Sequence, residues 1–435
     1  MPSLHTRRLF LRSSALGAAV ASTLPALLER TFFTLDALAA DSPVQTPTGK
    51  DAPILVVLQM AGGNDGLNTV VPFADDAYHQ ARPVIGIKPD QVLKINDAVG
   101  LHPKLTGLKE LYDHGHLGIV QGVGYPNPDR SHFRSTDIWQ TASDADQYET
   151  YGWLGRYFDN ACRGAEPTVG VAIGSEMPEA FASPNPTGIA FQRPEQYRWR
   201  GARDGDSVQT LFRQLNHPDD SQPAAPASGA SIASLSGSST HPGSTLDFLQ
   251  RVALDAQLSS DKVIEIARKS QPQADYPRNP LGQSLSLVAR LIAGGLPTRV
   301  YYVAQGGYDT HTNQTGTHDR LLEELGNSMA AFSKDLQAHG SLDRVLLMTF
   351  SEFGRRVSQN GSNGTDHGAA APMFIMGGQS KPGLFGKYLS LTDLDRGDLK
   401  YNVDFRSIYA AVLENWLHAP SEPILGKRFY PLAIV

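Results

Sequence analysis

Short runs of apolar, largely β-branched residues alternate along this chain with longer segments of helical periodicity, and this alternation restricts the fold more than any other feature. The runs contain no polar alternation, which is typical of strands buried on both faces. They lie at residues 54–58, 117–120, 299–303, 345–350 and 373–376, and the helical patterns lie at 103–114, 246–269, 281–292, 318–338 and 405–417. Strands that alternate with helices predict an α/β fold, a three-layer α/β/α sandwich around one mainly parallel sheet.

Polar side chains cluster where the predicted strands end. In open sheets of this kind, ligands bind outside the carboxyl ends of the strands. The segments that follow the first four runs, or precede the fifth, are rich in carboxylates, histidines and arginines: Asn64-Asp65, residues 125–133, Asp309-Thr310-His311, residues 351–356 and Asp366-His367. A purely structural protein has little use for such a gathering, so we expect a binding or catalytic site at this edge.

Each member of this set also has an ordinary structural explanation, which the sequence leaves open. The glycine-rich segment 62–66 is compatible with a simple turn. Ser131 is compatible with a helix cap, and Arg355-Arg356 with a solvated pair. His367 is compatible with a hydrogen bond to the turn before Gly368. Asp309 and His311 are two apart in an extended segment, which puts both side chains on one side.

Composition narrows the ways in which this chain could bind a metal or a partner. Cys162 is the only cysteine, so an intramolecular disulfide and a cysteine-based zinc site are both excluded. Any metal must therefore be held by His, Asp or Glu. The formal net charge of −6 argues against a general nucleic-acid binder, which would carry a basic stripe. Beyond the first forty residues no segment approaches the length of a membrane span, so we expect no stable membrane anchor.

The first 39 residues have the pattern of a twin-arginine export signal. Arg7-Arg8 precede an apolar run at 15–28, and Ala37-Leu38-Ala39 offers a small-residue cleavage site. The alternative is an amphipathic or membrane-spanning helix, against which the short run and Pro25 both argue. We therefore expect a periplasmic or secreted protein that meets the twin-arginine translocase during export. Because that pathway carries folded proteins, often with a cofactor inserted, a bound metal is expected.

After that signal, the sequence predicts one α/β domain over residues 40–435. A segment rich in Ser, Ala, Pro and Gly at about 217–245 cannot bury much apolar surface, and we expect it to be a surface insertion.

Three segments carry a resemblance to a known family: GGNDGLNTVVP within 56–72, RSHFRSTDIWQT at 130–141, and SEFGRR with GTDHGAAAP within 351–372. Together with the export signal they resemble the bacterial family called domain of unknown function 1501. This family is similar in organisation to the alkaline phosphatase and sulfatase superfamily. The resemblance implies an alkaline-phosphatase-like fold and one or two divalent metal ions, with zinc, calcium, magnesium and manganese all open.

The resemblance also implies roles for individual residues. Ser131 matches the nucleophile by its place at a helix start. Arg130, Arg355 or Arg356 would hold the oxygens of the transferred group. Metal ligands are implied at five positions, which are Asp65, Asp309, His311, Glu352 and His367. The chain departs from the superfamily pattern at Glu352-Phe353, where an Asp-His pair is expected; Glu can ligate a metal but Phe cannot, and Asp366 could compensate.

Two functions remain open at this point. The leading hypothesis is an exported, metal-dependent hydrolase of phosphate or sulfate esters, which acts on a small anionic ester or a sugar-linked substrate. The alternative is a non-catalytic secreted binding or assembly protein that keeps a degenerate hydrolase scaffold. The hydrolase requires the five implied ligands to converge, and divergent side chains would favour the binding protein.

Overall fold

The computed structural model describes residues 52–185, 188–196 and 259–435. The chain divides into two units, Met1–Phe32 with Pro194–Ile264 and Phe33–Arg193 with Glu265–Val435. The second unit contains every element described below except the 3-10 turn Pro194–Gln196. Three predicted features lie outside the described residues: the export signal, the insertion and most of the helix at 246–269. The single domain over residues 40–435 stays a prediction.

Within the described residues, nine strands form one mainly parallel sheet of order β11-β5-β10-β9-β1-β8-β6-β7, with β14 beside β5. β10 is the exception, since it runs antiparallel to both β5 and β9. The strands are β1 (Ile54–Ala61), β5 (Leu117–Gly124), β6 (Gly170–Ile173), β7 (Ile189–Phe191), β8 (Val300–Gly306), β9 (Val345–Phe350), β10 (Ala371–Gly377), β11 (Gly383–Phe385) and β14 (Val403–Asp404). All five predicted strands are therefore confirmed, and those at 54–58, 299–303 and 345–350 are neighbours.

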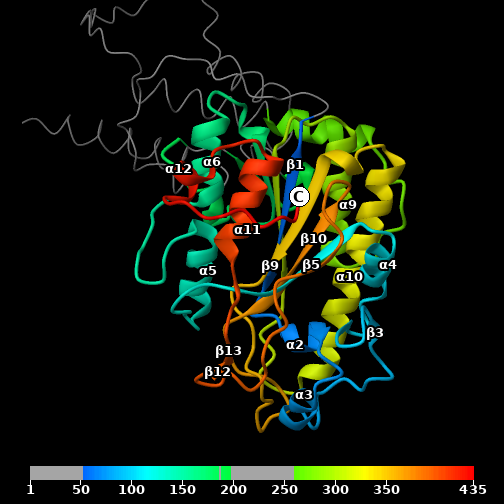
Figure 1. The fold of residues 1–435 in the computed structure, drawn as a ribbon. Helices are drawn as coiled ribbons and strands as arrows, with labels where there is room; N and C mark the ends of the chain where they lie inside the picture. The colour runs from blue at the N-terminus through cyan, green and yellow to red at the C-terminus, as the bar shows by residue number, and fades with distance from the viewer. Residues whose placement is uncertain (1–51, 186–187, 197–258) are drawn as a thin grey trace, which may run out of the picture. The chain divides into compact units, whose positions relative to one another are not determined.

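Helices cover both faces of this sheet (Figure 1). One face packs against α5 (His132–Thr141), α6 (Trp153–Ala161), α11 (Phe405–Ala411) and α12 (Ser421–Leu425), whose apolar side chains share one core with the strands. On the other side lie α4 (Thr106–Asp113), α9 (Pro280–Ala293) and α10 (Gln314–Ala338). Burial on both faces explains the continuous apolar runs of β1, β9 and β10. The predicted three-layer architecture is confirmed.

Local signals set several helix boundaries. Asn279 accepts a hydrogen bond from Gly282 N and Pro280 takes the first position of α9, which fits its fixed φ. Asp404 caps α11 by accepting from Arg406 N. The predicted helix at 405–417 is α11 continued by one π-helical turn, η7 (Val412–Trp416). The sequence analysis missed α6, β6 and β7.

Smaller elements surround the carboxyl edge of the sheet. They are α2 (Gly66–Thr69), β2 (Val70–Val71), α3 (Asp76–Ala81), β3 (Leu93–Lys94), β4 (Gly100–Leu101), β12 (Leu394–Asp395) and β13 (Asp398–Leu399). Short 3-10 turns complete the second unit and its boundary: η3 (Pro167–Val169), η4 (Glu179–Phe181), η5 (Pro194–Gln196) and η6 (Leu342–Arg344). In the described part of the chain, no helix is both long and apolar enough to cross a membrane.

Strand direction brings the predicted polar segments to one edge. β1, β8 and β9 run parallel, with Ala61 opposite Gly306 and Gln59 opposite Phe350, so the loops after them leave side by side. Because β10 is antiparallel, the segment that precedes it lies at the same edge. Gly62 makes this proximity feasible: its φ is 121°, and a Cβ there would lie 2.5 Å from the backbone nitrogen of Asp309.

Candidate metal centre

Three histidines surround the carboxylate of Asp309 at this edge. Asp309 Oδ1 lies 2.9 Å from His311 Nε2 and 3.2 Å from His367 Nε2, and its Oδ2 lies 3.4 Å from His132 Nε2. His132, Asp309 and His367 each offer a ligand atom within 4.8 Å of the other two. The segment after β8, the loop before β10 and the start of α5 therefore contribute to one cluster.

The Nδ1 atom of each histidine faces an oxygen. His132 Nδ1 is 2.8 Å from Glu352 Oε1, His311 Nδ1 is 3.3 Å from Asp366 Oδ1, and His367 Nδ1 is 2.8 Å from the carbonyl oxygen of Arg130. A carboxylate or carbonyl oxygen can only accept, so a proton on each Nδ1 satisfies all three of these contacts. In the neutral ring, Nε2 then carries the lone pair, which is the arrangement found in metal-ligating histidines.

The Nε2 atoms converge in a way that favours a cation between them. His311 Nε2 and His367 Nε2 lie 2.9 Å apart. Two imidazole lone pairs at that distance repel each other unless a proton or metal ion lies between them. Together with Asp309 Oδ1 they form a triangle with sides of 2.9, 2.9 and 3.2 Å. A tetrahedral ion with bonds of about 2.0–2.1 Å needs ligand separations of about 3.3 Å, so the residues fit a metal.

The Nε2 atom of His132 also points to a metal ion at this position. This atom is buried and makes no hydrogen bond within the described residues. A buried acceptor without a partner is costly, and such atoms in native proteins commonly mark a ligand, an ion or a water. The arrangement is thus a candidate His/Asp site made by His132, Asp309, His311 and His367.

The protonation states of Asp309 and His367 suit metal ligands. Burial alone would raise the pKa of Asp309, but the hydrogen bond and the charge of Arg355 outweigh it and lower the pKa to about 2. Burial, assisted by the charges of Arg355 and His132, lowers the pKa of His367. Asp309 is therefore ionised and His367 neutral at pH 7, the protonation states in which both bind metals.

Phe353 holds two of the histidine rings in place. Its ring centre lies 4.9 Å from that of His132 and 4.5 Å from that of His367. Gly63 opposite leaves room for the ring, because a Cβ there would come within 2.2 Å of it. At the position where the resemblance implied the histidine of an Asp-His pair, this chain thus has a phenyl ring that packs against His132 and His367.

Glu352 lies behind His132 and does not face the other ligand atoms. Its Oε1 accepts hydrogen bonds from Gly62 N at 2.8 Å and from His132 Nδ1 at 2.8 Å. The carboxylate thereby orients the imidazole and increases its basicity. Asp366 supports His311 in the same way, whereas the sequence analysis considered it for a ligand's place.

Arg355 is fully committed within the protein. Its Nε donates to Gly63 O at 2.6 Å and its Nη1 to Thr365 O at 2.8 Å, while its Nη2 donates to Tyr308 O at 3.0 Å and Asp309 Oδ1 at 2.8 Å. The side chain is 0% exposed and ties together the loops that carry the ligands. Its expected role in holding the transferred group stays a prediction, and its nitrogen atoms are occupied by the protein.

Asp65 lies in a separate, buried network. Its Oδ2 accepts from Arg82 Nη1 at 2.6 Å, with both side chains 0% exposed, and from Gln314 Nε2 at 2.5 Å. Burial alone would raise the pKa of Asp65, but the Arg82 charge and hydrogen bond outweigh it and lower the pKa. The Arg82 guanidinium thus lies against Oδ2, whereas Oδ1 is buried and makes no hydrogen bond within the described residues, and the ligand role of Asp65 stays a prediction.

Ser131 occupies the N-cap position of α5, immediately before His132. The residue is exposed, and its side chain makes no capping hydrogen bond. The Ser131 hydroxyl therefore does not cap α5, although Ser131 stands at the N-cap position. The first N–H groups of a helix lack partners within the helix and attract anions. At this helix start Ser131 N donates to Asp129 Oδ1 at 2.7 Å, and the exposed Ser131 hydroxyl directly precedes His132 of the histidine cluster.

Sequence reasoning missed His132. The residue lies within a strand-end segment, RSHF, that was singled out for Ser131. A histidine next to a candidate nucleophile was the available signal, but the rotation of α5 that turns His132 inward is a property of the packed structure.

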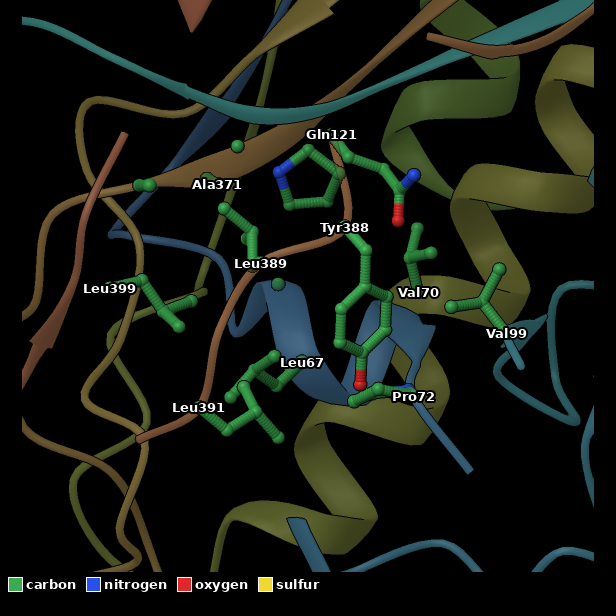
Figure 2. Close-up of a pocket in the computed structure, with 14 residues that line it drawn as sticks. Leu67, Val70, Pro72, Val99, Gln121, Ala371, Tyr388, Leu389, Leu391 and Leu399 are labelled. Atoms are coloured by element: carbon green, nitrogen blue, oxygen red, sulfur yellow. The ribbon is translucent and has the colours of Figure 1, made fainter. Parts of the chain in front are cut away.

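A hollow lined mostly by aliphatic side chains lies elsewhere in the second unit (Figure 2). Leu67, Val70, Leu389, Leu391 and Leu399 contribute to it, and Gln121 and Tyr388 are the members of its lining with polar side chains. None of the residues that line it is a His, Asp, Glu or Cys.

Several solved structures are similar to this chain. The C-terminal periplasmic domain of EcEptC from Escherichia coli, in complex with zinc, is 12% identical, with 79% of this chain and 78% of that chain covered and a TM-score of 0.33. A protein in the alkaline phosphatase superfamily from Vibrio parahaemolyticus is 8% identical, with coverage of 90% and 74% and a TM-score of 0.36. The lipoteichoic acid synthase LtaP from Listeria monocytogenes is 8% identical, with coverage of 79% and 71% and a TM-score of 0.33.

No curated protein matches the chain. Residues 52–415, which span the whole sheet from β1 through α11, match the family described as "Protein of unknown function (DUF1501)", and the chain belongs to this family.

Proposed function

We propose that this protein is an exported, metal-dependent hydrolase of phosphate or sulfate esters, with Ser131 as nucleophile. One observation carries the proposal. Four candidate ligand atoms from His132, Asp309, His311 and His367 converge, and His132 directly follows Ser131, whose exposed hydroxyl makes no capping hydrogen bond at the start of α5.

The donor set favours zinc among the metals considered. Three imidazole nitrogens and one carboxylate suit zinc or a similar transition metal, whereas calcium and magnesium prefer all-oxygen sites. When bound, such an ion lowers the pKa of a coordinated hydroxyl or water and neutralises the oxygens of a phosphoryl or sulfuryl group.

The chain's own residues then supply the rest of the chemistry. The Ser131 Oγ attacks the phosphorus or sulfur atom, and the bond between that atom and the ester oxygen breaks. The hydroxyl proton passes to the departing oxygen, which leaves as the alcohol. Water then attacks the seryl ester, one of its protons returns to Ser131 Oγ, and the inorganic anion is released. The free N–H groups of α5 and the Arg130 guanidinium bind the non-bridging oxygens, since both are donors at this edge.

Turnover of a generic aryl phosphate and an aryl sulfate tests the proposal. The zinc-loaded protein should hydrolyse one of them, a chelator should abolish that turnover, and Ser131→Ala should remove it while the metal content stays unchanged. His367→Ala should lose both metal and turnover, whereas His114→Ala, a change of an exposed histidine at the end of α4, should lose neither. Metal binding without turnover of any ester would support the non-catalytic binding protein instead.

The export part of the proposal rests on residues 1–39 and has its own test. Arg7→Lys together with Arg8→Lys preserves the charge but removes the arginine pair that the translocase reads as an address. The variant precursor should remain in the cytoplasm. Normal export of the variant would show that the segment is not a twin-arginine signal.

A further inference from the structure

Two arginines near the histidine cluster share a single buried carboxylate. Arg130 Nη2 forms an ion pair with Asp398 Oδ2, and Arg356 Nε lies 3.8 Å from Asp398 Oδ1. Asp398 is 3% exposed at its side chain, whereas Arg130 and Arg356 are 35% and 39% exposed. One buried carboxylate therefore lies between two partly exposed guanidinium groups.

The β12–β13 hairpin places Asp398 between Arg130 and Arg356. Its two-residue turn has positive φ at both Arg396 (53°) and Gly397 (89°), as in a type I′ turn that joins two strands tightly. Asp395 and Asp398 are directly opposite each other across the hairpin. In Figure 1 the hairpin lies at the same end of the molecule as α2 and α3. A turn of this kind fixes where the Asp398 carboxylate sits.

Both arginines are also attached to the ligand-bearing loops through their backbones. The carbonyl of Arg130 accepts from His367 Nδ1 at 2.8 Å, and Arg356 N donates to Asp366 O at 3.0 Å. The nitrogen atoms of the buried Arg355 are all engaged by the protein. In the described part of the chain, by contrast, the side chains of Arg130 and Arg356 form ion pairs only with Asp398. Their remaining N–H groups are available to a ligand.

We propose that Arg130 and Arg356 form an oxyanion-binding pair beside the metal centre and that Asp398 is its positioning residue. The ligand is a tetrahedral oxyanion, the phosphoryl or sulfuryl group of the substrate or the inorganic anion released from it, so the inference rests on the proposed function. A carboxylate this buried cannot lose both cations without a large desolvation cost. Arg130 therefore stays hydrogen-bonded to Oδ2 and Arg356 stays near Oδ1, and both guanidiniums keep other N–H groups for the ligand.

Titration calorimetry of the full, zinc-loaded protein with inorganic phosphate tests this inference. Asp398→Asn should weaken phosphate binding by about tenfold or more while the zinc content stays unchanged, because the loss of orientation affects charge-assisted hydrogen bonds. Asp395→Asn is the matched control: it removes the same charge from the same hairpin, at a side chain that is 55% exposed and pairs with Arg396, and should change phosphate affinity little. Unchanged or tighter phosphate binding in Asp398→Asn would overturn the inference.

A double-mutant cycle separates positioning from a purely structural role. If Asp398 acts through the arginines, Asp398→Asn should have little further effect on phosphate affinity in an Arg130→Gln, Arg356→Gln background. Full additivity of the changes would overturn the inference. Should Asp398→Asn fail to fold, Arg356→Gln alone, a change of a partly exposed side chain, must still weaken phosphate binding.

These outcomes remain distinct from those of the proposed function. Phosphate binding that depends on the arginines, without ester turnover, would support the pair and refute the hydrolase. Ester turnover with a KM indifferent to Asp398→Asn would support the hydrolase and refute the pair. A zinc-loaded wild type that binds neither phosphate nor sulfate would overturn the pair outright.

Discussion

Replacement of Glu352 distinguishes a carboxylate that supports a ligand from one that binds the metal itself. The side chain is 2% exposed, and its Oε1 accepts from both Gly62 N and His132 Nδ1 at 2.8 Å. Glu352→Ala leaves both donors without their acceptor and frees the His132 ring to rotate or change tautomer. Glu352→Gln keeps an acceptor oxygen but removes the charge that makes the imidazole more basic.

The expected loss follows from this supporting position. Removal of a carboxylate that orients a metal-binding histidine typically weakens metal affinity 10- to 100-fold, equivalent to about 1.4–2.8 kcal/mol. We expect Glu352→Ala to lie near the upper end of that range, since two hydrogen bonds are lost. Glu352→Gln should lie near the lower end, because the hydrogen-bonding geometry persists.

Competition with a chromophoric chelator at neutral pH measures zinc affinity directly. The series would include the wild type, both Glu352 variants and His367→Ala, with circular dichroism to verify that each is folded. Zinc affinity should fall in the order wild type, Glu352→Gln, Glu352→Ala, His367→Ala. Equal affinity in the first three would refute the supporting role. A loss in Glu352→Gln as severe as in His367→Ala would show that Glu352 is a direct ligand, as the resemblance implied.

Three further predictions concern the framework of the site. Arg82→Met should lower the free energy of unfolding by about 3–5 kcal/mol in urea titrations, because it strands a fully buried carboxylate, and a loss below about 1 kcal/mol would contradict the buried pair. Burial lowers the pKa of His102 and of His318 to about 4, so the unfolded chain binds more protons between pH 4 and 6.5. The metal-free protein should therefore have its full stability above pH 6.5. Below that pH its free energy of unfolding should fall by up to about 1.4 kcal/mol per pH unit for each histidine. His318→Gln should reduce this slope, and a pH-independent free energy of unfolding would exclude neutral buried histidines. Gly62→Ala, which forces a Cβ to 2.5 Å from backbone, should destabilise the fold and weaken zinc binding, whereas Gly361→Ala, with open space around its Cα, should do neither.

The sequence by itself determined the framework and the edge that carries the chemistry. Continuous apolar runs predicted β1, β5, β8, β9 and β10, because burial on both faces leaves a local signature that requires no partner to be known. Sheet architecture then determined the edge, since parallel strands release their following loops on one side. The pairing of Asp309 with His311 was also local, because residues two apart in an extended segment face the same way.

Only the tertiary structure decided which polar groups at that edge face one another. Asp65 and Glu352 both follow buried strands, yet Arg82 neutralises the first and His132 engages the second. These contacts join residues 17 and 220 positions apart, and no periodicity predicts them. His132 turns inward because of how α5 packs on the sheet. Sequence pattern sets the location of a site, whereas side-chain orientation depends on partners that are close only after folding.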